Sequence, residues 1–179
     1  MNIRPYCIAL LTLMHLTLTA QKYVSGESLV VFYSHAPIED IRAENSKGTA
    51  LFDSGSGNIA IVIPIKEFRF AKALMQEHFN EKYLESERFP KSTFQGTILG
   101  FDSMSDSLQR VTAKGKLTIH GVTRSVELPV EMRKTADVLK MHSVFKIRVE
   151  DFKIKIPTIL WQNIAEEIEV TTDFSFRPK

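Results

Sequence analysis

The sequence has little cysteine, little excess charge and few residues that interrupt regular structure. Its one cysteine is Cys7, so a chain that begins at residue 21 has no disulfide, no thiol nucleophile and no thiolate metal ligand. The 23 basic residues are nearly balanced by 21 acidic ones and form no basic stripe, which argues against nucleic-acid binding. With 8 glycines and 7 prolines in 179 residues, long regular elements are expected.

The first twenty residues have the layout of a secretory signal peptide. Arg4 supplies one positive charge, a mostly apolar run follows from Cys7 to Leu18, and Thr19-Ala20 adds small residues. This run is shorter than the roughly 20 apolar residues that a membrane-spanning helix needs. We therefore expect a signal peptide over residues 1–20, one domain over residues 21–179, and a periplasmic or secreted protein that does not span a membrane.

After position 28, apolar and polar side chains alternate with the period of a half-buried strand. The alternation is clearest over residues 111–119 and 125–134, which are joined by His120-Gly121-Val122-Thr123 and predict an antiparallel hairpin. The remaining predicted strands cover residues 28–34, 38–44, 48–53, 58–66, 93–101, 138–150 and 168–177. No helical pattern long enough for a parallel crossover separates them, so the sheet is predicted to be antiparallel.

Strands with one apolar face must close on themselves or stack in two layers. A barrel is favoured here, because closure removes strand edges and several of the predicted strands exceed the usual length of about five or six residues. The predicted fold class is therefore all-β, an antiparallel β-barrel. At about eight strands, a barrel interior is either filled by side chains or holds one small ligand.

Two helical segments are predicted to interrupt the strands. Residues 70–80 are rich in helix formers and carry an apolar stripe that includes Phe70, Leu74, Met75 and Phe79. A second, short helix is predicted over residues 158–165, after Pro157. The first helix would cap the barrel, either over a packed core or over a ligand cavity.

The spacings typical of catalytic and metal sites are missing. The histidines after residue 20 include no pair at i, i+2 or i, i+4, and Ser54-Gly55-Ser56-Gly57 lacks the strand-to-helix setting of a nucleophile elbow. Acidic pairs fall on predicted surfaces or loops: Glu39-Asp40, Glu85/Glu87 and Glu166-Glu167. We therefore predict no catalytic residues, no metal site and no required cofactor.

Three blocks of sequence are nevertheless distinctive when taken in order. The first is Ser34-His35-Ala36-Pro37-Ile38-Glu39. The second runs from Ala73-Leu74-Met75-Gln76-Glu77-His78-Phe79-Asn80 to Phe89-Pro90-Lys91-Ser92-Thr93-Phe94-Gln95-Gly96. The third is Gly115-Lys116-Leu117-Thr118-Ile119-His120-Gly121-Val122-Thr123, followed by Leu128-Pro129-Val130. Together they resemble the YceI-like lipid/polyisoprenoid-binding family.

The resemblance implies an extended, lipocalin-like barrel exported to the bacterial periplasm. Its interior tunnel would hold an isoprenoid quinone, a polyisoprenoid or a fatty acyl chain, bound without covalent chemistry. From the alternation of the strands and the stripe on the helix, the following residues are expected to line that tunnel: Phe32, Phe70, Leu74, Met75, Phe79, Phe94, Ile98, Ile119, Phe145 and Trp161.

Two other classes of function stay open at this point. One is a barrel with a filled core that acts through its surface, as an envelope-stress or protein-interaction module. The other is a hydrolase or isomerase on the same scaffold, in which His35, His78 or His120 would have to meet a nucleophile inside the cavity. The oligomeric state is equally open, and a homodimer that closes the barrel mouths is compatible with the sequence.

Overall fold

Most of the residues that the structure describes form β-strands. The computed structural model describes residues 21–35, 40–156 and 165–179. In these residues the strands are β1 (Lys22–Ser34), β2 (Ile41–Asn45), β3 (Thr49–Asp53), β4 (Asn58–Pro64), β5 (Arg69–Phe70), β6 (Lys91–Leu99), β7 (Gln109–Ile119), β8 (Val122–Thr135), β9 (Val138–Arg148) and β10 (Glu167–Pro178). Helix α1 (Ala73–His78) continues into a π-helical turn, η2 (Phe79–Tyr83). Two 3-10 turns are η1 (Ile65–Glu67) and η3 (Val149–Phe152).

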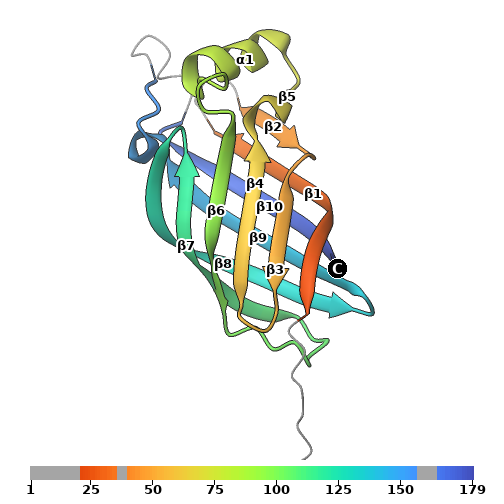
Figure 1. Cartoon of the computed structure of the whole chain (residues 1–179). Helices are drawn as coiled ribbons and strands as arrows, with labels where there is room; N and C mark the ends of the chain where they lie inside the picture. Colours follow the sequence, from red (N-terminus) through yellow and green to blue (C-terminus); the bar gives the residue numbers. More distant parts are fainter. Residues whose placement is uncertain (1–20, 36–39, 157–164) are drawn as a thin grey trace, which may run out of the picture.

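Eight of these strands close into a barrel (Figure 1). Hydrogen-bonded neighbours follow the order β10-β9-β8-β7-β6-β4-β3-β1, and β1 pairs with β10 to complete the ring. The closing ladder runs from Tyr23 opposite Pro178 to Tyr33 opposite Glu169. Each pairing around the ring is antiparallel. The predicted all-β antiparallel barrel is thereby confirmed.

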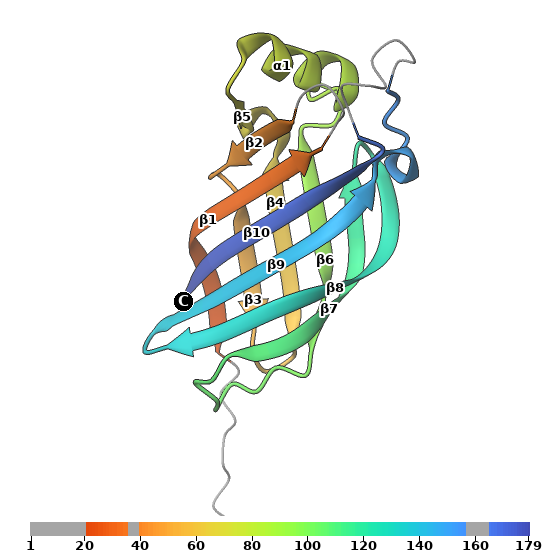
Figure 2. The same ribbon diagram turned by 180° about the vertical axis from the view of Figure 1, so that it is seen from behind.

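The wall next to α1 is built differently from the rest. The first residues of β1, Lys22–Val24, pair with β3, whereas Val30–Ser34 pair with β2. β5 then pairs with β2 through Phe70 opposite Ala43. Helix α1 lies over this end of the barrel (Figure 2). Two short strands and one helix therefore surround the mouth of the barrel.

The opposite end of the barrel is filled with side chains. Phe52, Met132, Leu139, Phe174 and Phe176 are among its almost completely buried residues. Phe52 contacts the ring of Phe176 at a centroid distance of 6.4 Å. Because this packing closes the far end, unfilled interior space lies toward α1.

The β7–β8 hairpin shows how local sequence sets one turn. Its two connecting residues, His120 and Gly121, have φ values of 50° and 71°, as a type I′ turn requires. A Cβ atom at Gly121 would lie 2.5 Å from the Phe89 ring, so glycine is needed there for space as well as for conformation. The hairpin predicted from the sequence is therefore confirmed.

Several predicted boundaries differ from the observed ones. β1 begins at Lys22 rather than residue 28, and Phe70, predicted as the first residue of the helix, belongs to β5. The prediction for Phe70 was wrong because helical periodicity carries no information about a pairing partner such as Ala43, which lies far away in the sequence. The predicted signal peptide and nearly all of the predicted second helix lie outside the described residues.

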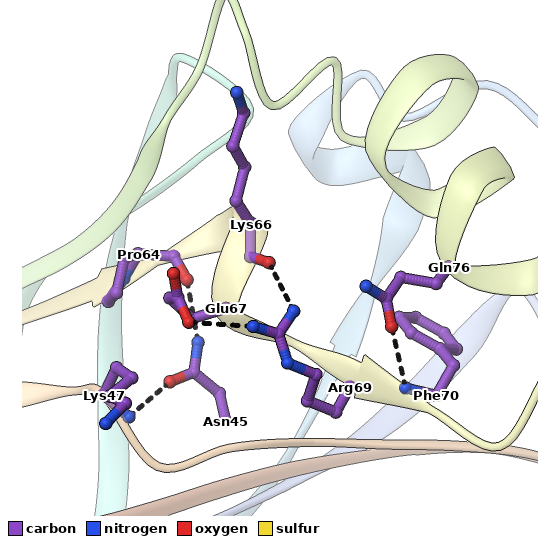
Figure 3. A network of polar contacts seen from close by, with 8 residues as sticks. All are labelled: Asn45, Lys47, Pro64, Lys66, Glu67, Arg69, Phe70 and Gln76. Atoms are coloured by element: carbon purple, nitrogen blue, oxygen red, sulfur yellow. Dashed lines mark hydrogen bonds and ion pairs between the residues drawn. The ribbon is translucent and has the colours of Figure 1, made fainter. Parts of the chain in front are cut away.

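A buried asparagine joins two strands that do not pair with each other. The Asn45 amide at the end of β2 is 0% exposed, and its Nδ2 donates to the Pro64 carbonyl at 2.7 Å (Figure 3). Its Oδ1 accepts from the Lys47 amide nitrogen at 2.8 Å. Asn45 thus supplies, through its side chain, a link between β2 and the end of β4 that the sheet does not make.

We expect Asn45→Ala to lower the free energy of unfolding by about 1–3 kcal/mol, because it leaves the Pro64 carbonyl without its donor in a buried site. Urea unfolding measures the change. The matched control is Asn58→Ala, at an exposed position on β4, where a change within about 0.5 kcal/mol is expected. Equal losses in the two variants would contradict this role of Asn45.

Candidate ligand-binding site

An apolar cavity of about 150 Å³ lies inside the barrel. Its lining comes from β1, β4, β6, β7, β8, β9 and β10, since inward side chains alternate along each strand. Within the described residues the lining includes no charged side chain, and its polar members are Ser92, Thr93, Ser143 and Thr172. Ser92 and Ser143 already donate to the carbonyls of Thr118 and Pro129. The cavity therefore offers little to a charged ligand.

A second space of about 300 Å³ lies between α1 and the barrel mouth. We call it the vestibule. It is bounded by α1, η2, β1, β2, β5 and the residues that follow η3, and its polar lining residues are Ser34, His78 and Tyr83. Burial raises the pKa of Tyr83, which keeps its hydroxyl protonated at neutral pH. The vestibule is therefore mostly apolar and has a few hydrogen-bonding groups.

Four phenylalanine rings stand where the two spaces meet. Phe32 stacks on Phe79 at 5.4 Å and 17°, and Phe68 and Phe70 contact both of these rings at 5.0–5.6 Å. Phe32 and Phe79 line the cavity and the vestibule alike. This aromatic cluster therefore forms part of the partition between the two spaces, together with Leu84, Ile154 and Ile168, which also line both.

The residues predicted to line a tunnel fall into both spaces. Phe94, Ile98, Ile119 and Phe145 line the barrel cavity only. Phe70, Leu74 and Met75 line the vestibule only. Phe32 and Phe79 line both spaces, whereas Trp161 lies outside the described residues. That any of them contacts a ligand stays a prediction.

Other lining residues were missed by the sequence reasoning. Ile59, Ile61 and Ile63 of β4 line the barrel cavity, and the alternation in the predicted strand over residues 58–66 would have identified them. Ile154 lines both spaces and Tyr83 the vestibule. Neither belongs to a periodic segment, so no signal in the sequence pointed to them.

Comparison with known protein families identifies the family of this chain. The model of the YceI-like domain matches residues 22–176. The chain belongs to the YceI-like family. No curated protein matches it significantly.

Solved structures of YceI-like barrels share the fold. BcnA from Burkholderia cenocepacia superposes with a TM-score of 0.70 at 18% identity, covering 83% of this chain and 95% of that one. A polyisoprenoid-binding domain from Saccharophagus degradans gives 0.73 at 14% identity, covering 88% and 98%. The YceI protein of Campylobacter jejuni gives 0.63 at 18% identity, covering 81% and 88%. At these identities the likeness shows the fold alone.

The described part of this YceI-like chain contains no group of three or more potential metal ligands. It also contains no helix long and apolar enough to cross a membrane. His35 contacts Asp40 at 2.6 Å at an exposed position, and His142 contacts Asp173 at 2.8 Å at a half-buried one. His78 is the histidine that lines the vestibule.

His120 links three elements at the mouth of this YceI-like barrel. Its Nδ1 lies 3.2 Å from the Phe152 carbonyl in η3, and its Nε2 lies 3.0 Å from Glu85 Oε1, after η2. The His120 side chain is 10% exposed and that of Glu85 41%. Glu85 lies in a loop with a partly exposed side chain, as predicted, but its contact with His120 was not predicted, because the two residues are 35 positions apart.

The hydrogen bond with His120 holds the pKa of Glu85 below its ordinary value near 4.5. Folding therefore favours the ionised carboxylate, and the resulting stability is present above the unfolded-state pKa and lost as the pH falls through the lowered folded-state pKa. We expect the stability advantage of the wild type over Glu85→Gln to shrink as the pH falls below about 4.5.

Thermal unfolding of both proteins from about pH 7 to about pH 3 measures this difference. The control is Glu87→Gln, whose side chain is 88% exposed and pairs with Lys66 on the surface. An advantage over Glu85→Gln that stays constant or grows toward acid pH would refute the expected linkage.

Proposed function

We propose that the protein binds a long apolar molecule without covalent chemistry and carries it in the bacterial cell envelope, after export directed by residues 1–20. The ligand class is an isoprenoid quinone, a polyisoprenoid or a fatty acyl chain. The observation that carries this proposal is the uncharged, almost wholly apolar lining inside a closed barrel. Each methylene group moved from water into such a lining contributes about 0.8 kcal/mol.

The volumes indicate how such a ligand would lie. A cavity of about 150 Å³ by itself holds a molecule no larger than benzene. A longer chain therefore has to occupy the cavity and the vestibule together, and the Phe32 and Phe79 rings must move aside for it. Its polar end would then lie in the vestibule, beside the hydrogen-bonding groups of Ser34, His78 and Tyr83.

The family supports the same class of ligand. The Saccharophagus degradans neighbour is described as a polyisoprenoid-binding domain. This chain shares its fold, and its own lining residues offer an isoprenoid chain apolar contacts and no charge to neutralise. A location in the periplasm agrees with the signal-peptide layout of residues 1–20.

The test of the proposal is to purify the protein from a bacterial host that exports it, extract it with organic solvent, and identify the released molecules by mass spectrometry. We expect a near-stoichiometric quinone, polyprenol or fatty acid. A folded protein that is empty, and that also fails to bind added decylubiquinone and cis-parinaric acid, would overturn the proposal. That result would favour the alternative of a barrel that acts through its surface.

Met75→Trp tests whether the vestibule is part of the ligand site. Met75 is partly buried and lines the vestibule from α1, so an indole there fills space that the ligand needs. We expect the Kd for cis-parinaric acid to rise by at least about tenfold, or about 1.4 kcal/mol, with the thermal midpoint nearly unchanged. A vestibule that is only packed core would instead be overpacked and lose stability.

The matched control for Met75→Trp is Glu77→Trp. Glu77 lies on the same helix, is exposed and does not line the vestibule, so the same new side chain is placed outside. We expect wild-type affinity from this variant. A loss of affinity in both variants would assign the effect to α1 itself and not to filling of the vestibule.

A further inference from the structure

The barrel wall is incomplete between β8 and β9. These strands pair only from Glu131 opposite His142 to Thr135 opposite Val138. Their other edges remain paired, β8 with β7 and β9 with β10. Residues 122–130 of β8 and 143–148 of β9 therefore face each other without a ladder, and we call this gap the β8/β9 seam. Figure 2 shows the two strands diverging from their shared tip.

Pro129 explains why the ladder stops. Ser143 Oγ donates to the Pro129 carbonyl at 2.6 Å, so this carbonyl faces β9. The N–H and C=O groups of one residue in an antiparallel strand face the same neighbour, and Pro129 therefore presents its missing N–H to β9. Proline is tolerated in a sheet at such unpaired edges. The Ser143 hydroxyl thus donates a hydrogen bond to Pro129 at the place where the backbone ladder would have continued.

The seam borders the ligand cavity. Leu128 on β8 and Phe145 and Ile147 on β9 line the cavity from the two sides of the seam. All three are only partly buried. In contrast, Met132 and Leu139, which face inward where β8 and β9 are paired, are 0% exposed. The inward side chains beside the seam are therefore less tightly packed than those beside the paired part of β8 and β9.

The end of the seam nearest α1 is covered by η3, which is joined to β8 by side-chain hydrogen bonds and to Glu166, before β10, by one backbone bond from the Val149 N–H at 3.0 Å. Arg124 Nε on β8 donates to the Asp151 carbonyl at 2.8 Å, and His120 contacts the Phe152 carbonyl. Val149, the first residue of η3, also lines the vestibule. Val149 and Phe152 of η3 are buried, but a four-residue turn held by these two side chains and a few hydrogen bonds opens at a lower free energy than a sheet does. Moving η3 would open the seam and the vestibule together.

We propose that the β8/β9 seam is the portal through which the apolar chain passes into and out of the barrel, with η3 as its flap. This inference rests on the proposed function. A route straight through the mouth would thread the whole chain lengthwise past the aromatic cluster, whereas the seam route displaces η3 and the hydrogen bonds that hold it. A lateral gap also lets a long chain enter sideways along its length.

The test is the rate of exchange of cis-parinaric acid, a fatty acid that fluoresces in apolar surroundings, measured by stopped flow on the full exported protein. Arg124 is exposed and lines neither space. We expect Arg124→Ala to raise the association and dissociation rates together by roughly fivefold, the effect of one lost hydrogen bond, and to leave Kd unchanged. If Arg124 only stabilised the barrel or the bound state, its substitution would not raise the association and dissociation rates equally.

The matched control is Arg42→Ala, on β2, which removes an exposed arginine paired with Glu44 on a strand that does not border the seam. We expect wild-type rates from it. Wild-type rates in Arg124→Ala, or a rise in dissociation alone, would overturn the portal while leaving the proposed function intact. A wild-type protein that binds no cis-parinaric acid and yields no extractable lipid would overturn both.

Discussion

The ladder between β1 and β10 is the interaction on which the rest of the structure depends. It joins the first described strand to the last, from Tyr23 opposite Pro178 to Tyr33 opposite Glu169. Without it, eight strands would form an open sheet with two exposed edges and no interior. With it, every inward side chain faces a common space, and the chain gains both its core and its cavity from the same closure.

How that space is used differs along the barrel. At the end far from α1, Phe52, Phe174 and Phe176 fill it. Toward α1 the side chains are mostly aliphatic and leave a cavity, and the aromatic cluster stands between the cavity and the vestibule. A barrel of about eight strands is either filled by side chains or encloses a cavity for a ligand. In this barrel, one end is filled and the cavity lies toward the other.

The irregular parts of the wall occur at the same end as the cavity. β1 exchanges β3 for β2 there, Asn45 bridges β2 to Pro64 by its side chain, and the β8/β9 ladder stops at Pro129. In each place side chains replace backbone pairing. Such links preserve the closed outline of the barrel and leave local segments free to open separately. The binding of a long apolar molecule that we propose needs both properties.

The sequence by itself determined the all-β class, the antiparallel pairing, the β7–β8 hairpin and the inward direction of residues such as Phe94 and Ile98, because alternation and turn chemistry are local properties. The family resemblance came from the sequence too. Only the tertiary structure decided that Phe70 belongs to β5, that Glu85 meets His120, and that β8 and β9 separate beyond Pro129. Those features depend on contacts between residues far apart in the chain, and the chain carries no local signal for which distant strand or side chain will be the partner.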